Sequence, residues 1–217
     1  MANALEQSDL PLAEKLGHAL NRISLAMRAD SWQATSEEGL NPTQGKILTL
    51  LGSRSGGLRL GDIATELAVS APTVSDSVGA LIEKGFVKKE RANDDGRAIA
   101  VTLLPAGRLV AKKMQSGGDS IGFAIELLPD DEREQLYRSI IKLIRGLQMA
   151  KRIPVARMCV TCQYFRPRVH DDDQRPHHCA LVDAAFGDRT IREDCPEHQV
   201  ADEHLAEQNW KKFTNTD

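Results

Sequence analysis

Apolar residues recur along most of this chain at the spacing of amphipathic helices, and over one short stretch at the spacing of strands. Six segments have the helical pattern: residues 10–28, 41–52, 60–67, 71–83, 107–114 and 130–147. Two segments have the strand pattern: residues 86–90 and 98–103, the second alternating Ile99, Val101 and Leu103 inward. This order predicts a mainly α protein with one small β-hairpin.

The two central helices form a recognisable unit. A tight turn at Ala68-Val69 separates them, and Ser70 is a favourable N-cap for the second helix. Two short helices joined in this way make a helix-turn-helix. The outward face of the second helix carries small side chains that suit a DNA major groove. These candidate DNA-binding residues are Ser70, Ala71, Pro72, Thr73, Ser75 and Asp76.

The hairpin that follows predicts a wing. Its polar tip runs from Arg91 to Arg97 and contains an Asp-Gly turn. Basic side chains on a wing are suited to phosphates or to a minor groove. Lys88, Arg91 and Arg97 are therefore further candidate DNA contacts.

These segments resemble the MarR family of winged-helix repressors. The resemblance rests on four strings in the family's order: Leu60-Gly-Asp-Ile-Ala, Ser70-Ala-Pro-Thr-Val-Ser-Asp, Leu81-Ile-Glu-Lys-Gly-Phe-Val and Asp95-Gly-Arg-Ala-Ile-Ala-Val-Thr-Leu-Leu-Pro-Ala-Gly107. It implies a homodimer that binds double-stranded DNA, with the first helix in the dimer interface and Asp95 and Arg97 in the wing motif. Two positions depart from the family pattern: Gly96 replaces a frequent basic residue, and Asp76 stands where many relatives carry Arg.

The sequence predicts four segments. Residues 1–40 form an N-terminal dimerisation helix and loop, 41–104 the winged helix-turn-helix, 105–153 dimerisation helices, and 154–217 a small Cys-rich module with an acidic tail. The face formed by Leu136, Ile140, Ile141, Ile144 and Leu147 is expected to pack against a second subunit. The alternative is that this face belongs to the core of its own subunit.

Charge is distributed unevenly along the chain. The net charge is −3, but residues 54–113 hold ten Lys or Arg against seven Asp or Glu, a net of +3. Residues 159–217 hold seven against twelve, a net of −5. Attraction to phosphates follows the local field, so the winged region remains suited to DNA. No 18-residue apolar run and no signal-peptide pattern occur, which predicts a cytoplasmic protein without a membrane partner.

All four cysteines lie near the C-terminal end, at Cys159, Cys162, Cys179 and Cys195. A Cys-x2-Cys pair is a chelating knuckle, because both sulfurs reach one centre from a tight turn. Since disulfides are disfavoured in the cytoplasm, the pattern predicts a metal site. Unliganded thiols, or a redox-active Cys159–Cys162 pair, are the alternatives.

The spacing favours an iron–sulfur cluster, most readily [4Fe–4S], over zinc. Zinc ribbons usually pair two knuckles, whereas here single cysteines follow at intervals of 16 and 15 residues. The string Cys162-Gln-Tyr-Phe165 also resembles the first cluster knuckle of high-potential iron–sulfur proteins. Tyr164, Phe165 and Phe186 are candidates to shield a cluster. Four histidines stand in reserve as ligands: His170, His177, His178 and His198.

The pattern predicts a dimeric transcriptional regulator, a repressor by its resemblance, whose tail senses redox state, iron or nitric oxide. No Ser/His/Asp set, paired carboxylates or deaminase motif indicates an enzyme. The competing possibilities are an enzyme or electron carrier that uses the cluster, and a MarR-type regulator that binds a small aromatic effector and carries a structural zinc.

Overall fold

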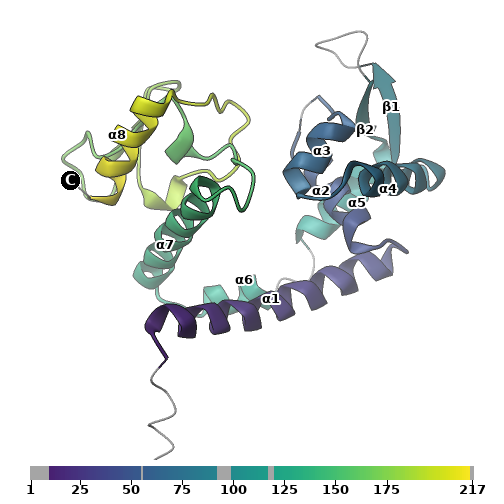
Figure 1. Ribbon diagram of the computed structural model, residues 1–217, viewed down its shortest axis with the longest axis horizontal. Coiled ribbons are helices and arrows are strands. Elements are labelled where there is room, and N and C mark those ends of the chain that lie inside the picture. Colours follow the sequence, from purple (N-terminus) through teal and green to yellow (C-terminus); the bar gives the residue numbers. More distant parts are fainter. Residues whose placement is uncertain (1–9, 55, 92–98, 117–119, 216–217) are drawn as a thin grey trace, which may run out of the picture. The chain divides into compact units, whose positions relative to one another are not determined.

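The computed structural model describes residues 10–54, 56–91, 99–116 and 120–215. The chain divides into two compact units, Met1–Leu127 and Leu128–Asp217, which we call the winged-helix unit and the cysteine unit. Figure 1 shows their elements in chain order. Each unit is described separately below.

The winged-helix unit contains helices and one hairpin. Its elements are α1 (Leu12–Glu37), α2 (Pro42–Gly52), α3 (Leu60–Leu67), α4 (Ala71–Glu83), β1 (Val87–Arg91), β2 (Ile99–Leu103), α5 (Pro105–Ser116) and α6 (Ser120–Glu126). Strands β1 and β2 are antiparallel, with Val87 opposite Leu103 and Arg91 opposite Ile99. The predicted helix-turn-helix and hairpin are therefore confirmed.

Local signals in the sequence account for these helices. Asn41 and Gln44 form a capping box at the start of α2, in which the Gln44 N–H donates to Asn41 Oδ1 at 2.9 Å. Ala68 ends α3 in the left-handed conformation, and the Ser70 side chain caps α4 by accepting from the Thr73 N–H. The buried core beneath is aliphatic and includes Ile47, Leu48, Ile63, Val74, Val78, Leu81 and Val101.

Helix α1 extends further than expected. Residues 31–37 continue it where a polar loop was predicted, because Thr35 is buried and its hydroxyl donates to the Ser31 carbonyl at 2.7 Å. A Cβ at Gly45 would lie 2.5 Å from Thr35 Cγ2, so the close approach of α1 and α2 requires glycine there.

One apolar side chain expected in the core is exposed. Ile99 is 60% exposed, whereas Ala100 is buried. Ile99 pairs with Arg91 at the end of the hairpin away from α5, so it extends beyond the layer of helices that buries Val101 and Leu103.

The cysteine unit combines two longer helices with short irregular elements. They are α7 (Asp130–Met149), η2 (Cys159–Thr161), β3 (Phe165–Arg166), β4 (His177–Cys179), β5 (Ala184–Phe186), η3 (Asp188–Thr190) and α8 (Glu203–Thr214). The three strands form an antiparallel sheet in the order β3-β4-β5.

Helix α7 shares its core with the cysteine segment. Ile141 is fully buried against Met158, Phe165 and Phe213, and Ile144 packs at the edge of the same cluster. The unit therefore begins at Leu128, whereas the sequence placed the boundary after residue 153. Ile141 and Ile144 therefore belong to the core of their own subunit, which was the alternative to a dimer contact. The cysteine segment supplies the apolar surface that a second subunit was expected to supply.

The opposite side of α7 remains open within its unit. Leu136, Leu143 and Leu147 are 38%, 54% and 46% exposed. Among the described helices, none has both the length and the apolar content that crossing a bilayer would require.

Candidate functional site

The outward face of α4 has the small side chains that the sequence predicted. Ser70, Ala71, Pro72, Thr73, Ser75 and Asp76 are all exposed. The hydroxyls of Ser70 and Thr73 lie 2.7 Å apart, which orders the first turn of the helix. Asp76 forms no ion pair with another described residue, so a carboxylate is presented on this face.

The basic side chains of the wing differ in their contacts. Lys88 pairs with Glu90 at 2.5 Å, and Glu90 also accepts from the Thr102 hydroxyl at 2.7 Å. These hydrogen bonds lower the pKa of Glu90, with Lys88 contributing most. Arg91 is exposed at the end of β1. Asp95, Gly96 and Arg97 lie outside the described residues, so the wing motif remains a prediction.

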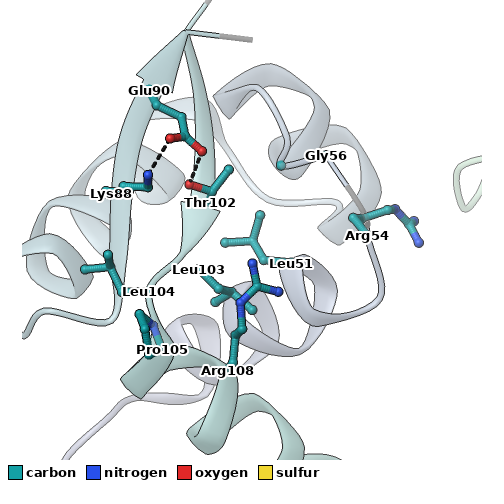
Figure 2. A pocket seen from close by; sticks show the side chains of 11 residues that line it. Leu51, Arg54, Gly56, Lys88, Glu90, Thr102, Leu103, Leu104, Pro105 and Arg108 are labelled. Carbon is teal, nitrogen blue, oxygen red and sulfur yellow. Dashed lines mark hydrogen bonds and ion pairs between the residues drawn. The ribbon is translucent and has the colours of Figure 1, made fainter. Parts of the chain in front are cut away.

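A cavity of about 330 Å³ lies at the base of the wing. Its apolar wall includes Leu51, Leu103 and Pro105, and Arg108 stands beside that wall (Figure 2). Lys88 and Glu90 also line the cavity. The cavity thus combines an apolar surface with a guanidinium, a suitable combination for a small organic anion.

The four cysteines meet at one place in the cysteine unit. Cys159, Cys162, Cys179 and Cys195 line a small, partly open cavity together with Tyr164, Phe165, Leu181, Phe186 and Glu197. All four are free thiols, and Cys162 is the most buried. The sequence separated these residues by up to 36 positions, and the fold brings them to a common site.

Each cysteine is positioned by a specific backbone segment. The Cys162 N–H donates to the Cys159 carbonyl at 2.9 Å, which makes the tight turn expected of a chelating knuckle. Cys179 ends β4 opposite Phe165, and the Cys195 N–H donates to the Arg157 carbonyl at 2.8 Å. Burial raises the pKa of the Cys159 thiol to about 11, and the other three cysteines add to that rise.

Two residues that the sequence did not single out stand beside these sulfurs. The Arg192 N–H donates to Cys159 Sγ at 3.2 Å, and its guanidinium Nη1 lies 3.8 Å from Cys195 Sγ. The Cys195 thiol donates to Glu197 Oε2 at 3.3 Å. The one sequence signal for this contact is that Glu197 lies two residues after Cys195.

The reserve histidines do not line the cysteine cavity. His177 is buried and bonds Asp188 Oδ1 through Nε2 at 2.8 Å, while its Nδ1 accepts from the Arg168 N–H. His170 and His178 lie against each other, with ring nitrogens 3.2 Å apart. His198 bonds Thr161 at 3.0 Å. These rings are engaged elsewhere in this structure, and their role as reserve ligands stays a prediction.

Helix α7 is hydrogen-bonded to the segment that precedes Cys195. The Tyr137 hydroxyl donates to the Ile191 carbonyl at 2.7 Å, next to Arg192. Arg138 donates to the Phe213 carbonyl and lies 3.6 Å from Asp188 Oδ2. Burial raises the pKa of Asp188, but the His177 hydrogen bond and Arg138 outweigh it and leave the pKa lowered.

Among the described residues, no three Cys, His, Asp or Glu side chains are placed to hold a single metal ion. Four cysteines nevertheless line the same cavity.

Comparison with known proteins finds relatives of the winged-helix unit. Residues 38–98 match the model of the MarR family. Two uncharacterized HTH-type transcriptional regulators of Bacillus subtilis are similar: YfiV, 28% identical over 110 residues covering 50% of this chain and 68% of that protein, and YwhA, 29% identical over 132 residues covering 60% and 94%.

Solved structures agree with the fold. A MepR–DNA complex from S. aureus covers 60% of this chain and 97% of its own, with 24% identity and a TM-score of 0.52. The family match ends at residue 98, before the first cysteine. Residues 38–98 are thus similar to the MarR family, and the structural likeness shows the winged-helix fold.

Proposed function

We propose that this chain is a dimeric, sequence-specific DNA-binding regulator whose cysteine unit holds an iron–sulfur cluster that sets DNA affinity. The observation that carries the DNA-binding part is the exposed face of α4 within the family-matched region. Small side chains there permit close approach to base edges, and Thr73 and Ser75 supply hydroxyls for base contacts.

The dimer is supported by helix α1. Leu12, Leu16, Leu20, Ile23 and Met27 recur on one face and are 42% to 72% exposed. Such a stripe is costly in water, and a second copy of the same helix is the proposed partner. One recognition helix per subunit then meets successive major grooves, about 10 base pairs apart.

Selection from a random duplex library tests this function. The expected product is a pseudo-palindrome with that half-site spacing.

Thr73→Ala or Ser75→Ala should change the preferred bases, each at a cost of about 1–3 kcal/mol on the original site. Arg91→Ala should weaken binding to all sequences and reduce the salt dependence, whereas Lys211→Ala on α8 is the charge-matched control. Equal binding to every duplex would reject sequence-specific regulation.

The cofactor proposal rests on the shared cysteine cavity. Cys159, Cys162, Cys179 and Cys195 are the proposed ligands, with Tyr164, Phe165 and Phe186 excluding water on one side. Ligation closes the cavity and links η2, β4 and the segment before α8, so metal loss should loosen the unit. A DNA affinity that differs between the two states is what makes the cluster a switch.

Protein purified without oxygen tests the cofactor. A brown protein with iron and sulfide in stoichiometric amounts supports the cluster. Stoichiometric zinc without visible absorption would replace the cluster by a structural zinc and leave the four ligands in place. The absence of both metals would remove the cofactor from the proposal.

The cavity at the wing base favours a second candidate function, regulation by a small organic anion. Arg108 and the apolar wall provide the recognition chemistry. Arg108→Ala should then abolish the response of DNA binding to aromatic carboxylates, while DNA binding without effector stays unchanged. An effector response that survives in Arg108→Ala would exclude this cavity.

A further inference from the structure

The corner of the cysteine cavity at Cys195 differs from the other three. Glu197 is the carboxylate that lines the cavity, and its Oε2 lies 3.3 Å from Cys195 Sγ. Among the described residues, no carboxylate forms a hydrogen bond with Cys159, Cys162 or Cys179. One sulfur ligand therefore has an oxygen donor beside it.

Arg192 keeps that oxygen donor in place. Its guanidinium Nη1 lies 3.5 Å from Glu197 Oε2 and 3.8 Å from Cys195 Sγ, so it attracts both groups. The Arg192 backbone is itself fixed, because its N–H donates to Cys159 Sγ and its carbonyl accepts from the Cys159 N–H at 2.9 Å. The carboxylate is thus held over the cavity although its side chain is 53% exposed.

The distances suit two donors to one metal. A thiolate sulfur lies about 2.3 Å from zinc and a carboxylate oxygen about 2.0–2.2 Å, and iron accepts both donor types. An oxygen 3.3 Å from the sulfur is therefore within reach of the same metal atom. The partial exposure of Cys195 lets water enter at this corner, whereas Cys162 is buried.

We propose that Glu197 is an alternative ligand for the metal atom bound by Cys195, which makes this corner exchangeable. In the exchange the metal–sulfur bond would break, the Cys195 thiolate would take a proton from a water molecule and leave hydroxide in the bulk solvent, and the Glu197 carboxylate would form a metal–oxygen bond. No electron is transferred. This inference rests on the proposed metal cofactor and identifies a ligand beyond the four cysteines.

The test compares metal content in variants purified without oxygen. Cys195→Ala should keep more than half of the iron and sulfide of the unmodified protein, because Glu197 completes the site. Cys195→Ala/Glu197→Gln should lose iron several-fold relative to Cys195→Ala. Glu197→Gln alone should keep its iron, and Cys162→Ala should lose it. Iron-57 Mössbauer spectra of Cys195→Ala should show one iron site changed toward oxygen ligation.

Two further variants separate ligation from folding. Cys195→Ala/Glu193→Gln removes a neighbouring carboxylate that bonds Tyr137 instead, and should match Cys195→Ala. Cys195→Ala/Glu197→His supplies another donor at the same position and should restore iron. The inference is overturned if Cys195→Ala loses iron as completely as Cys162→Ala, or if Glu197→Gln makes no difference in the Cys195→Ala background.

A failure of the cofactor proposal itself would appear in the protein with its natural sequence, not in the variants. A protein with its natural sequence that contains neither iron nor zinc would remove the cofactor and with it this ligand. If it contains zinc, the same variants are read by zinc content. Failure of the Glu197 role alone would appear only in the Cys195→Ala background.

Discussion

The two units bury apolar surface in different ways. Among its described residues, the winged-helix unit has thirteen in its buried cluster, all aliphatic and mostly supplied by regular helices and the hairpin. The described part of the cysteine unit has seven residues in its buried cluster, and one of these is Cys162. Its rings compensate in part, with Phe165, His177, Phe186 and Phe213 meeting at centroid distances of 5.3–6.1 Å. Small cores are often supplemented by a bound metal, and this is the structural role we propose for the cofactor.

The largest expected effect is therefore metal removal, and it should be confined to one unit. Chelation, or Cys162→Ser, should reduce amide-exchange protection in residues 158–213 by about 100-fold or more, the loss expected for a ligand bound at 100 times its Kd. Protection of α2, α3 and α4 should not change. Exchange mass spectrometry distinguishes the units directly, and unchanged protection in the cysteine unit would contradict its dependence on metal.

Core truncations should reveal the same division. Leu81→Ala and Ile141→Ala each remove a fully buried side chain, and each should destabilise its own unit by about 2–5 kcal/mol. Calorimetry should show two transitions, with only one shifted in each variant. A single transition that moves in both variants would mean that the units unfold together.

The partly buried Asp188 sharpens the comparison through pH. Asp188→Ala removes the acceptor of the His177 ring and the carboxylate that faces Arg138, and should destabilise the cysteine unit by about 1–3 kcal/mol at neutral pH. Because the folded pKa of Asp188 is lowered, its contribution is complete above the unfolded value of about 3.9 and is lost as the pH falls through the folded value.

The stability difference between Asp188→Ala and the unmodified protein should therefore shrink in acid. Asp171→Ala is the matched control, because Asp171 is exposed, forms no hydrogen bond or ion pair with another described residue, and should change stability by less than about 0.5 kcal/mol. A difference that persists unchanged below the folded pKa would show that the carboxylate charge is not the cause.

The smallest expected effect concerns local capping in the winged-helix unit. Ser70→Ala removes the cap of α4 and should cost about 1 kcal/mol, whereas Ser70→Gly should cost only a few tenths. Urea denaturation of both variants measures this difference. Equal losses would indicate that the Ser70 hydroxyl does not stabilise the helix.

Much of the winged-helix unit was predictable because its signals are local. The capping residues Asn41 and Ser70 and the helical spacing of buried residues each act within a few positions of the chain. The extension of α1 and the exposure of Ile99 were not predictable in this way. They depend on how far the neighbouring elements reach, as the contact between Thr35 and Gly45 illustrates.

The cysteine unit was predictable in its chemistry but not in its packing. The spacing of the four cysteines anticipated a shared site, since thiol chemistry is carried by residue type. The packing of Ile141 against Phe165 and the hydrogen bond between the buried His177 ring and Asp188 depend on long-range contacts that no periodicity encodes. Glu197 was not singled out, because nothing in the sequence distinguishes it from the other carboxylates near the cysteines.

The central claim is that the state of the cysteine site sets DNA affinity, and fluorescence anisotropy on the selected pseudo-palindrome tests it most directly. The titration compares anaerobic holo-protein, the same protein after cluster removal, and Cys179→Ser. The account predicts that the last two agree with each other and differ from the holo-protein by about tenfold or more, equivalent to about 1.4 kcal/mol of coupling. Identical affinities for all three samples would contradict it, even if the cluster itself were present.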